Sequence, residues 1–557
     1  MAVTITDNRT VVSEADATTG WTAPSGVAVF TSAPDPVEAT GSLGIQVSNA
    51  TEQAYFTRAS SNITNTCVYA WLLPGGVLDT TVNGGIQIYL GDGTNDRGYH
   101  VGGSNGAGFR HDDGPVVWQC FALDTGSLPT NTTNFVGAGA PNFAATTRFG
   151  NVFKTLAKSV GGQENCFMDI AFFGNGGLTI TGGGAGTEGK FLEIAVRDRS
   201  TADHPGTGVA SATGGAYGIC RELGADLFGL QARMQFGSAT TGSIDFEDTG
   251  QTVVFEDRGF GTDKYGYTIT GNAGGTTSFI LGTRTGEGTG SNGCSLVTPA
   301  GVGAFFTASS ANIDTLGLYD CTLAGFTNGI TFASTGTTNH EIFATSFTGS
   351  GLITVGTTEF KNNSISGSTA TSAILLSTTT NVSDLDFISA GTGHAITITT
   401  PGTYDFTNFT YSGYAGTNGT TGNEVFYNNS GGLVTINVVG GDSPTVRNGT
   451  GASTTVNNNI NITVTNLKDN TEVRVYLTST LDDTPPYTAP TEVAGIEIAT
   501  AGTTNARTFT FSIAGGTGIT IRTFNERWIA DDISIAPSST QDVQVSQRQD
   551  RVFSNPV

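Results

Sequence analysis

Three hydrophobic patterns follow one another along the chain. Within residues 1–200, strand-like runs such as Cys67–Leu73 and Phe167–Phe173 are apolar at both odd and even positions, and Gly-rich turns separate them. Strands that are covered on both faces produce such runs. The pattern predicts an N-terminal β-sandwich or jelly roll over residues 1–200.

A weak repeat marks residues 201–435, where short β pieces alternate with Gly, Asn, Thr and Ser. Aligned segments end on apolar residues spaced 24, 18, 22 and 22 residues apart, at Leu323, Phe347, Ile365, Phe387 and Phe409. A period of about 22 residues with two or three short strands suits the stacked coils of a parallel β-helix. We therefore expect a central right-handed parallel β-helix.

Strict alternation of apolar and polar residues begins after residue 435, for example at Val473, Val475 and Leu477. Antiparallel strands with one buried face alternate in this way. We expect a C-terminal antiparallel β-sandwich over residues 436–536. Residues 537–557 are polar and Gln-rich, which predicts a frayed tail or an arm exchanged with a neighbouring subunit.

The composition supports an all-β fold class. Gly accounts for 79 of 557 residues, and charged residues make up 13%, which is about half the usual quarter. These values exclude charge-rich helical bundles and coiled coils. A hydrophobic share of 37% with 33 Phe excludes a disordered chain.

The net charge and the N-terminal sequence limit the classes of binding partner and the cellular location that we expect for this protein. The net charge is −23 and no run of Lys or Arg occurs, which argues against nucleic acid as a partner. The polar N-terminus lacks a signal-peptide pattern, and no apolar run reaches 18 residues, so we expect neither export by a signal peptide nor membrane insertion. The six cysteines form no C-x-x-C pair, and buried free thiols are expected, although their disulfide state cannot be assigned from spacing.

Two sets of polar residues are candidates for chemistry. Asp92, Asn95 and Asp96 lie on a Gly-bent loop and offer oxygen atoms for a structural calcium ion, but turn formation explains them equally well. No other cofactor is expected. Asp384 and Asp386 are expected to point the same way from one strand, as the two carboxyl groups of a glycoside hydrolase must. Because 47 acidic residues must occupy a largely exposed surface and no active-site motif surrounds this pair, we expect binding rather than catalysis.

The order of sandwich, β-helix, terminal sandwich and polar tail resembles appendage proteins of tailed bacteriophages, particularly those that infect marine bacteria. At the level of motifs the resemblance covers residues 463–557, from the segment Thr463–Tyr476 to the closing segment Asp550–Pro556. It implies synthesis in the host cytoplasm, incorporation into the virion beside other virion proteins, and a homotrimer.

We therefore expect a virion tail spike or fibre whose rigid surface recognises a host-cell polysaccharide or receptor. Two alternatives stay open at this point. One is a capsid decoration or head-fibre protein, and the other is an extracellular polysaccharide lyase or glycoside hydrolase of β-helix type. The residues do not state the position on the virion, the host, the receptor or the terminus that anchors the chain.

Overall fold

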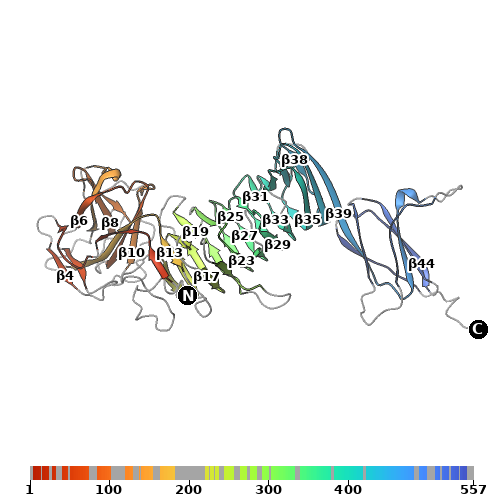
Figure 1. Ribbon diagram of the computed structural model, residues 1–557, viewed down its shortest axis with the longest axis horizontal. Helices are drawn as coiled ribbons and strands as arrows, with labels where there is room; N and C mark the ends of the chain where they lie inside the picture. The colour runs from red at the N-terminus through yellow and green to blue at the C-terminus, as the bar shows by residue number, and fades with distance from the viewer. Residues whose placement is uncertain are drawn as a thin grey trace, which may run out of the picture. The chain divides into compact units, whose positions relative to one another are not determined.

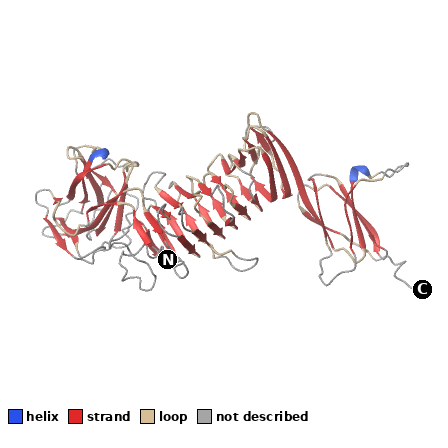
Figure 2. Ribbon diagram, viewed as in Figure 1, coloured by secondary structure: helices blue, strands red, loops and turns tan. Residues whose placement is uncertain are grey.

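The computed structural model contains two compact units, Met1–Thr354 and Val355–Val557, and each is described by itself. The chain is all-β, and the described residues contain only two short 3-10 helices, Phe143–Ala145 and Thr478–Thr480 (Figures 1 and 2). The structure describes residues 4–13, 15–23, 28–32, 41–47, 51–73, 85–101, 119–129, 137, 139–154, 164–181, 220–224, 226–230, 232–237, 244–255, 264–271, 276–284, 292–299, 303–332, 339–377, 382–417, 422–481, 489–498, 508–514, 517–525, 528–537 and 540–548.

Two antiparallel sheets form the N-terminal part of the first unit. One sheet has the order β10-β7-β12-β5-β4, with β2 paired to β12, and the other has the order β3-β6-β11-β8-β9. The strands of the first sheet are β2 (Thr10–Ser13), β4 (Ala28–Ser32), β5 (Ser42–Val47), β7 (Cys67–Leu73), β10 (Gln119–Asp124) and β12 (Glu164–Phe173). Those of the second sheet are β3 (Trp21–Thr22), β6 (Thr51–Ser61), β8 (Gly85–Gly91), β9 (Asp96–His100) and β11 (Thr146–Lys154).

The two sheets share one hydrophobic core, as predicted from the runs that are apolar at both odd and even positions. Leu72 of the first sheet and Ile88 of the second are both almost fully buried in it, as is Phe153. Full burial of such side chains stabilises by about 1.5–3 kcal/mol each. Residues 182–200 of the predicted domain lie outside the described residues, and the jelly-roll connection stays a prediction.

Three parallel ladders make up the rest of the first unit. Ladder A contains β13 (Leu178–Thr181), β16 (Arg233–Phe236), β19 (Tyr265–Ile269), β22 (Ala304–Ala308), β25 (Ile330–Phe332) and β28 (Ile353–Thr354), and β1 (Thr4–Asp7) pairs antiparallel with β13. Ladder B contains β17 (Ile244–Asp248), β20 (Thr277–Leu281), β23 (Thr315–Tyr319) and β26 (Asn339–Phe343). Ladder C contains β15 (Leu227–Leu230), β18 (Thr252–Phe255), β21 (Ser295–Val297), β24 (Thr322–Ala324) and β27 (Ser346–Thr348), with β14 (Cys220–Gly224) antiparallel to β15.

The chain visits the ladders in the fixed order B, C, A, so that one coil contains three strands. This arrangement is of the β-helix-like kind that the repeat predicted. It also shows that β1 and β13, which lie within the predicted 1–200 domain, belong to ladder A. The boundary at residue 200 is therefore wrong for these two strands.

Aromatic side chains stack along the interior of the coils. Phe246 and Phe279 occupy the same register on adjacent strands of ladder B, and their rings are stacked at 5.0 Å. Phe236 of ladder A packs against both, at 4.8 and 4.9 Å between ring centroids. Such ring pairs add about 0.5–1.5 kcal/mol beyond the area that they bury.

A left-handed backbone residue forms the corner between ladders B and C in successive coils. Asp320 and Ala344 have φ values of 52° and 54°, one coil apart. In the second unit Asn362, Asp384 and Asn408 have φ values of 55°, 54° and 49°. Asn and Asp tolerate this conformation, whereas in Ala it costs about 1–2 kcal/mol of conformational free energy.

In three coils of the first unit, the inward residue that starts the turn into ladder C binds the coil before it. The Cys294 thiol donates to the carbonyl oxygen of Asp248 at 3.4 Å, the Cys321 thiol to that of Leu281 at 3.4 Å, and the Thr345 hydroxyl to that of Leu318 at 3.3 Å. These three acceptors occupy one register of ladder B. A column of short donors therefore ties these three coils to their predecessors.

The cysteines with described side chains are free and buried, as predicted: Cys67, Cys120, Cys166, Cys294 and Cys321. Burial raises the pKa of Cys294 to about 11 and that of Cys321 to about 12, so both remain protonated donors at neutral pH. The side chain of Cys220 lies outside the described residues.

Parallel ladders also open the second unit. The first contains β31 (Ser372–Leu376), β34 (His394–Ile398), β36 (Phe426–Asn428) and β38 (Val446–Asn448). The second contains β29 (Glu359–Lys361), β32 (Val382–Ser383), β35 (Gly402–Ser412), β37 (Leu433–Gly441) and β39 (Ser453–Thr465). The third contains β30 (Ser364–Ser366) and β33 (Asp386–Ile388) and ends on β35.

The observed register corrects one position of the sequence alignment. Leu323 pairs with Phe347, and Ile365 pairs with Phe387, as the repeat predicted. Phe387 then pairs with Tyr411 rather than with Phe409. Phe409 is fully buried two residues earlier, because it directly follows the corner at Asn408, as buried Leu385 follows the corner at Asp384.

Strand β39 belongs to two structures at once. Its first half, Ser453 to Asn459, pairs in parallel with β37, and its second half, Asn459 to Val464, pairs antiparallel with β42 (Phe509–Ala514). The predicted boundary at residue 435 is therefore wrong, since the parallel region continues to residue 459. Strand β37 of the coils alternates buried and partly exposed residues just as β40 of the C-terminal domain does, so the pattern does not mark the boundary.

The C-terminal two-sheet domain follows from the alternating strands. Strands β42, β39 and β45 (Gln541–Gln544) face a sheet of order β41-β40-β43-β44 across a shared core. The strands of that sheet are β40 (Thr471–Leu477), β41 (Glu492–Ile498), β43 (Ile519–Asn525) and β44 (Trp528–Ile535).

The predicted tail is not wholly a tail. Strand β45 pairs in parallel with β39 of the same chain, and Val543 and Val545 are buried in the core of the domain. The prediction of a frayed or exchanged segment is therefore wrong for residues 541–547, because alternate apolar residues there complete the core. Residues 549–557 lie outside the described part of the chain.

The strained corner at Ala344 gives a stability prediction. Ala344→Gly is expected to preserve the fold and to raise the free energy of unfolding by up to about 1 kcal/mol, because Gly adopts positive φ without a Cβ clash. The control Ala308→Gly changes a buried strand residue of β22 and is expected to lower it by about 1 kcal/mol. Guanidinium unfolding measures both, and equal losses in the two variants would contradict the corner assignment.

Candidate functional site

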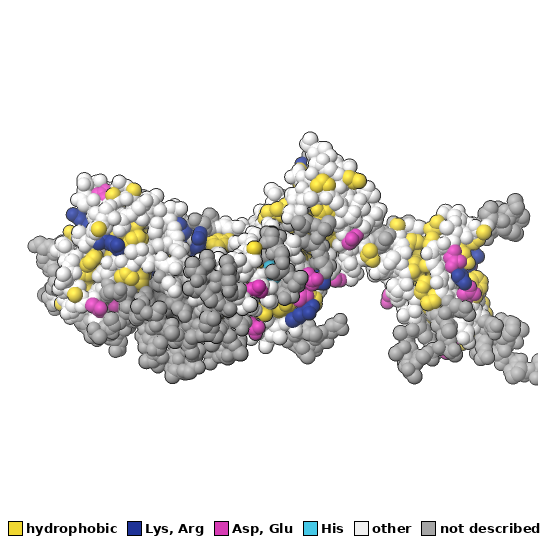
Figure 3. Space-filling model, in the orientation of Figure 1, with side chains coloured by type: hydrophobic (Ala, Val, Ile, Leu, Met, Phe, Trp, Pro, Cys, Tyr) yellow, Lys and Arg dark blue, Asp and Glu magenta, His cyan; other side chains and the backbone are white. Residues whose placement is uncertain are grey.

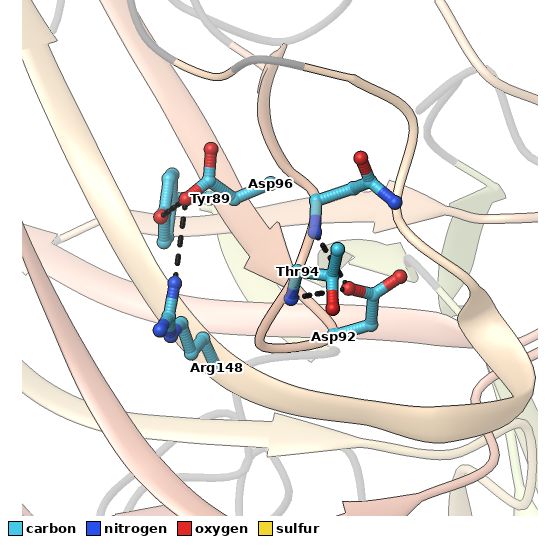
Figure 4. A network of polar contacts seen from close by, with 6 residues as sticks. Tyr89, Asp92, Thr94, Asp96 and Arg148 are labelled. Atoms are coloured by element: carbon cyan, nitrogen blue, oxygen red, sulfur yellow. Dashed lines mark hydrogen bonds and ion pairs between the residues drawn. The ribbon is translucent and has the colours of Figure 1, made fainter.

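The loop between β8 and β9 holds the residues predicted to bind calcium. The Asp92 carboxylate accepts backbone N–H groups of Thr94 at 2.8 Å, Asn95 at 2.7 Å and Asn142 at 2.7 Å. Figure 4 shows the bond from Thr94. These three hydrogen bonds lower the pKa of Asp92 to about 2. Asp92 therefore acts as the charged centre of a turn.

Asp96 faces a different set of partners. Its carboxylate accepts the Tyr89 hydroxyl at 2.5 Å and lies 3.4 Å from the Arg148 guanidinium (Figure 4). Burial, followed by the hydrogen bond to Asp96, raises the pKa of the Tyr89 phenol. Asp96 thus joins strands β8, β9 and β11 at the edge of the sheet.

The donor set does not fit a calcium site well. Calcium takes six to eight oxygen ligands, whereas both oxygens of Asp92 and one of Asp96 already accept hydrogen bonds from different groups. Among the described residues no group of three or more His, Cys, Asp or Glu side chains is placed to hold a metal. Calcium at Asp92, Asn95 and Asp96 stays a prediction, and turn chemistry accounts for the loop.

The candidate catalytic carboxylates occupy separate elements. Asp384 is the left-handed corner between β32 and β33, and Asp386 is the first residue of β33. The expectation that they lie on one strand is wrong, because the chain turns between them with Leu385 buried inside. Their catalytic role stays a prediction.

Each of these carboxylates is bound to the next coil. The Asn408 amide donates to Asp384 at 2.6 Å, and the Thr410 hydroxyl donates to Asp386 at 2.7 Å. A similar row runs across β35, β37 and β39, where Asn437 donates to Asp405 at 2.6 Å and Asn457 donates to Asn437 at 2.8 Å. The exposed carboxylates of these coils therefore act as acceptors in side-chain ladders, each bond contributing about 1 kcal/mol.

A cluster that sequence reasoning missed lies on the outward face of ladder B. Arg284, which follows β20, reaches Glu341 of β26 with an N···O distance of 2.8 Å and lies 5.9 Å from the ring centroid of Phe343. Tyr319 is the register neighbour of Phe343 on β23. We call these four residues the ladder B cluster. No local motif reveals it, because Arg284 and Glu341 are 57 positions apart.

Figure 3 shows the side chains of the described surface on one face, where uncharged polar residues and backbone dominate and charged side chains are few. Among the described residues, no helix is long and apolar enough to cross a membrane.

Comparisons with known proteins give little further direction. No family model matches the sequence, and no curated protein matches it either. Among solved structures, the Agl-KA catalytic domain is similar at 12% identity and a TM-score of 0.19, covering 81% of this chain and 98% of that one. The catalytic domain of GH87 alpha-1,3-glucanase in complex with nigerose is similar at 10% identity and a TM-score of 0.16, covering 82% and 86%. At these TM-scores the likeness carries no argument about activity.

The hydrogen bonds to Asp92 predict how its contribution depends on pH. Because its folded pKa lies below the usual value of an aspartate, Asp92 stabilises the fold above about pH 4 and loses this effect as the pH falls toward about 2. Asp92→Asn is therefore expected to lower the melting temperature at pH 7 and to leave it unchanged near pH 2. Tryptophan fluorescence measures both, and a difference that persists at pH 2 would contradict the assignment.

Proposed function

We propose that the chain is a subunit of a tailed-phage virion appendage, a homotrimeric tail spike or fibre whose rigid β surface recognises a host-cell glycan. The parallel ladders support this proposal, since stacked coils give a long surface with side chains at a fixed spacing of about 4.8 Å. On this proposal the parallel region is a right-handed β-helix. The protein is made in the host cytoplasm and joins other virion proteins.

The observation that carries the choice of binding over cleavage is the state of the outward carboxylates. Glycoside hydrolysis needs one protonated and one ionised carboxyl group flanking the bond. Asp384 and Asp386 do not flank a gap for such a bond, since one lies at a corner and the other on β33, and each accepts a hydrogen bond from the next coil. Exposed polar side chains on a regular β surface are in general well suited to hydrogen-bonding sugar hydroxyls without a deep pocket.

The edge strands of the two sheets in the C-terminal domain support the proposal of a homotrimer. Strands β42 and β45 end one sheet and β41 and β44 end the other, with no further pairing partner among the described strands. Exposed strand edges promote uncontrolled pairing unless another surface covers them. A closed trimer would cover these edges in a symmetric way.

The trimer gives a mass prediction. Light scattering of the purified full-length chain is expected to give about three times the monomer mass of 57.2 kDa. A single-chain mass in dilute buffer would contradict the homotrimer. Electron microscopy of the virion then distinguishes a few trimers at a tail from the many copies of a capsid decoration protein.

The proposal that the protein binds a glycan without cleaving it gives a second prediction. Incubation with host capsular polysaccharide is expected to release no new reducing or unsaturated ends, and Asp384→Asn with Asp386→Asn is expected to leave polysaccharide binding unchanged. Release of oligosaccharides that both substitutions abolish would contradict this proposal. It would then favour the glycoside hydrolase or lyase.

A further inference from the structure

The ladder B cluster combines apolar ring surface with hydrogen-bonding groups that protein contacts do not use up. The side chain of Arg284 is 62% exposed, while that of Glu341 is only 12% exposed. Within the described part of the chain, Arg284 makes one ion pair, to Glu341, and one ring contact, to Phe343. A guanidinium has five N–H donors, so several remain for a ligand.

The register between β23 and β26 places the two aromatic side chains of the ladder B cluster next to each other. Tyr319 and Phe343 are paired neighbours on β23 and β26, and both point outward because Leu318 and Ile342 are fully buried. Both rings are partly exposed. Two adjacent aromatic side chains on a rigid sheet form a platform that loses little entropy when a ligand binds.

A glycine determines where the Tyr319 ring lies. A Cβ at Gly317 would come within 2.6 Å of Cε2 of Tyr319, so this ring occupies the space above the glycine. Gly317 pairs with Glu341 on the next strand, which brings the phenol beside the carboxylate. Burial, with a smaller effect of the Glu341 charge, raises the pKa of Tyr319, so the phenol keeps its proton.

Packing over a glycine alone would stabilise the sheet, and it explains Tyr319. It does not explain Arg284, which crosses from the β20 coil over β23 to Glu341 on β26 and remains largely exposed. An exposed ion pair of this kind contributes only about 0–1 kcal/mol to stability. The geometry therefore points to recognition rather than to stability as its main effect.

We propose that Arg284, Tyr319, Glu341 and Phe343 form a binding site for a neutral hexose oligosaccharide. The apolar face of a pyranose ring packs on Phe343 and Tyr319, and its hydroxyls bind the guanidinium and the carboxylate. Because the ion pair is neutral as a unit and the whole chain carries a charge of −23, an uncharged glycan suits the site better than a polyanion. This inference rests on the proposed role in glycan recognition and names the residues that perform it.

The test uses the full-length protein and defined probes. Isothermal titration with neutral hexasaccharides of glucose, galactose and mannose is expected to give saturable binding to at least one of them. Arg284→Ala and Phe343→Leu are each expected to weaken that binding about tenfold or more, with melting temperatures close to wild type. Arg474→Ala is the matched control, since Arg474 is also an exposed arginine in ion pairs with two glutamates, and it is expected to bind as wild type does.

The possible results of this titration distinguish a failure of the proposed binding site from a failure of the proposed glycan-recognition role. Wild-type binding that Arg284→Ala and Phe343→Leu leave unchanged would overturn the site while the role in glycan recognition stands. Binding to alginate, an acidic polysaccharide, but to none of the neutral probes would overturn the proposed class of ligand. No binding of any probe at about 1 mM would overturn the site as one for neutral hexose oligosaccharides, and failure to bind host capsular polysaccharide as well would overturn the glycan-recognition role.

Discussion

The structure depends on one repeated constraint, which is that each coil must return to the register of the coil before it. Parallel backbone hydrogen bonds impose this register, and the left-handed corner makes the return possible with few residues. The column of Cys294, Cys321 and Thr345 then fixes the corner from inside, because each side chain donates to a carbonyl of the preceding coil. Interior Phe residues fill the remaining space in the same register.

This constraint separates the two faces of every strand. Inward positions must be small donors or large apolar groups that stack, so they tolerate little change. Outward positions need only suit a pleated surface, and here they carry Thr, Ser, Asn and isolated charges. Recognition chemistry can therefore vary on the outer face without disturbing the core, as the ladder B cluster illustrates with side chains from three successive coils.

The same register also limits what the carboxylates can do. Side chains at equivalent positions of adjacent coils lie about 4.8 Å apart, which is close enough for Asn or Thr to donate to Asp. Asp384, Asp386 and Asp405 are all engaged in this way. A regular outer surface of this kind is therefore better suited to binding than to acid–base chemistry.

The sequence by itself determined the all-β class, the parallel coils and part of their register. The spacing of single buried residues such as Leu323 and Phe347 reports the coil directly, because the short strands β24 and β27 each have one buried side chain. It misplaced Phe409, the boundary at residue 435 and the segment 541–547, because alternating β patterns look alike whether a strand continues a coil or joins a sandwich. Only the tertiary structure placed Asp384 at a corner and brought Arg284 to Glu341, since these contacts form between coils and leave no local spacing in the chain.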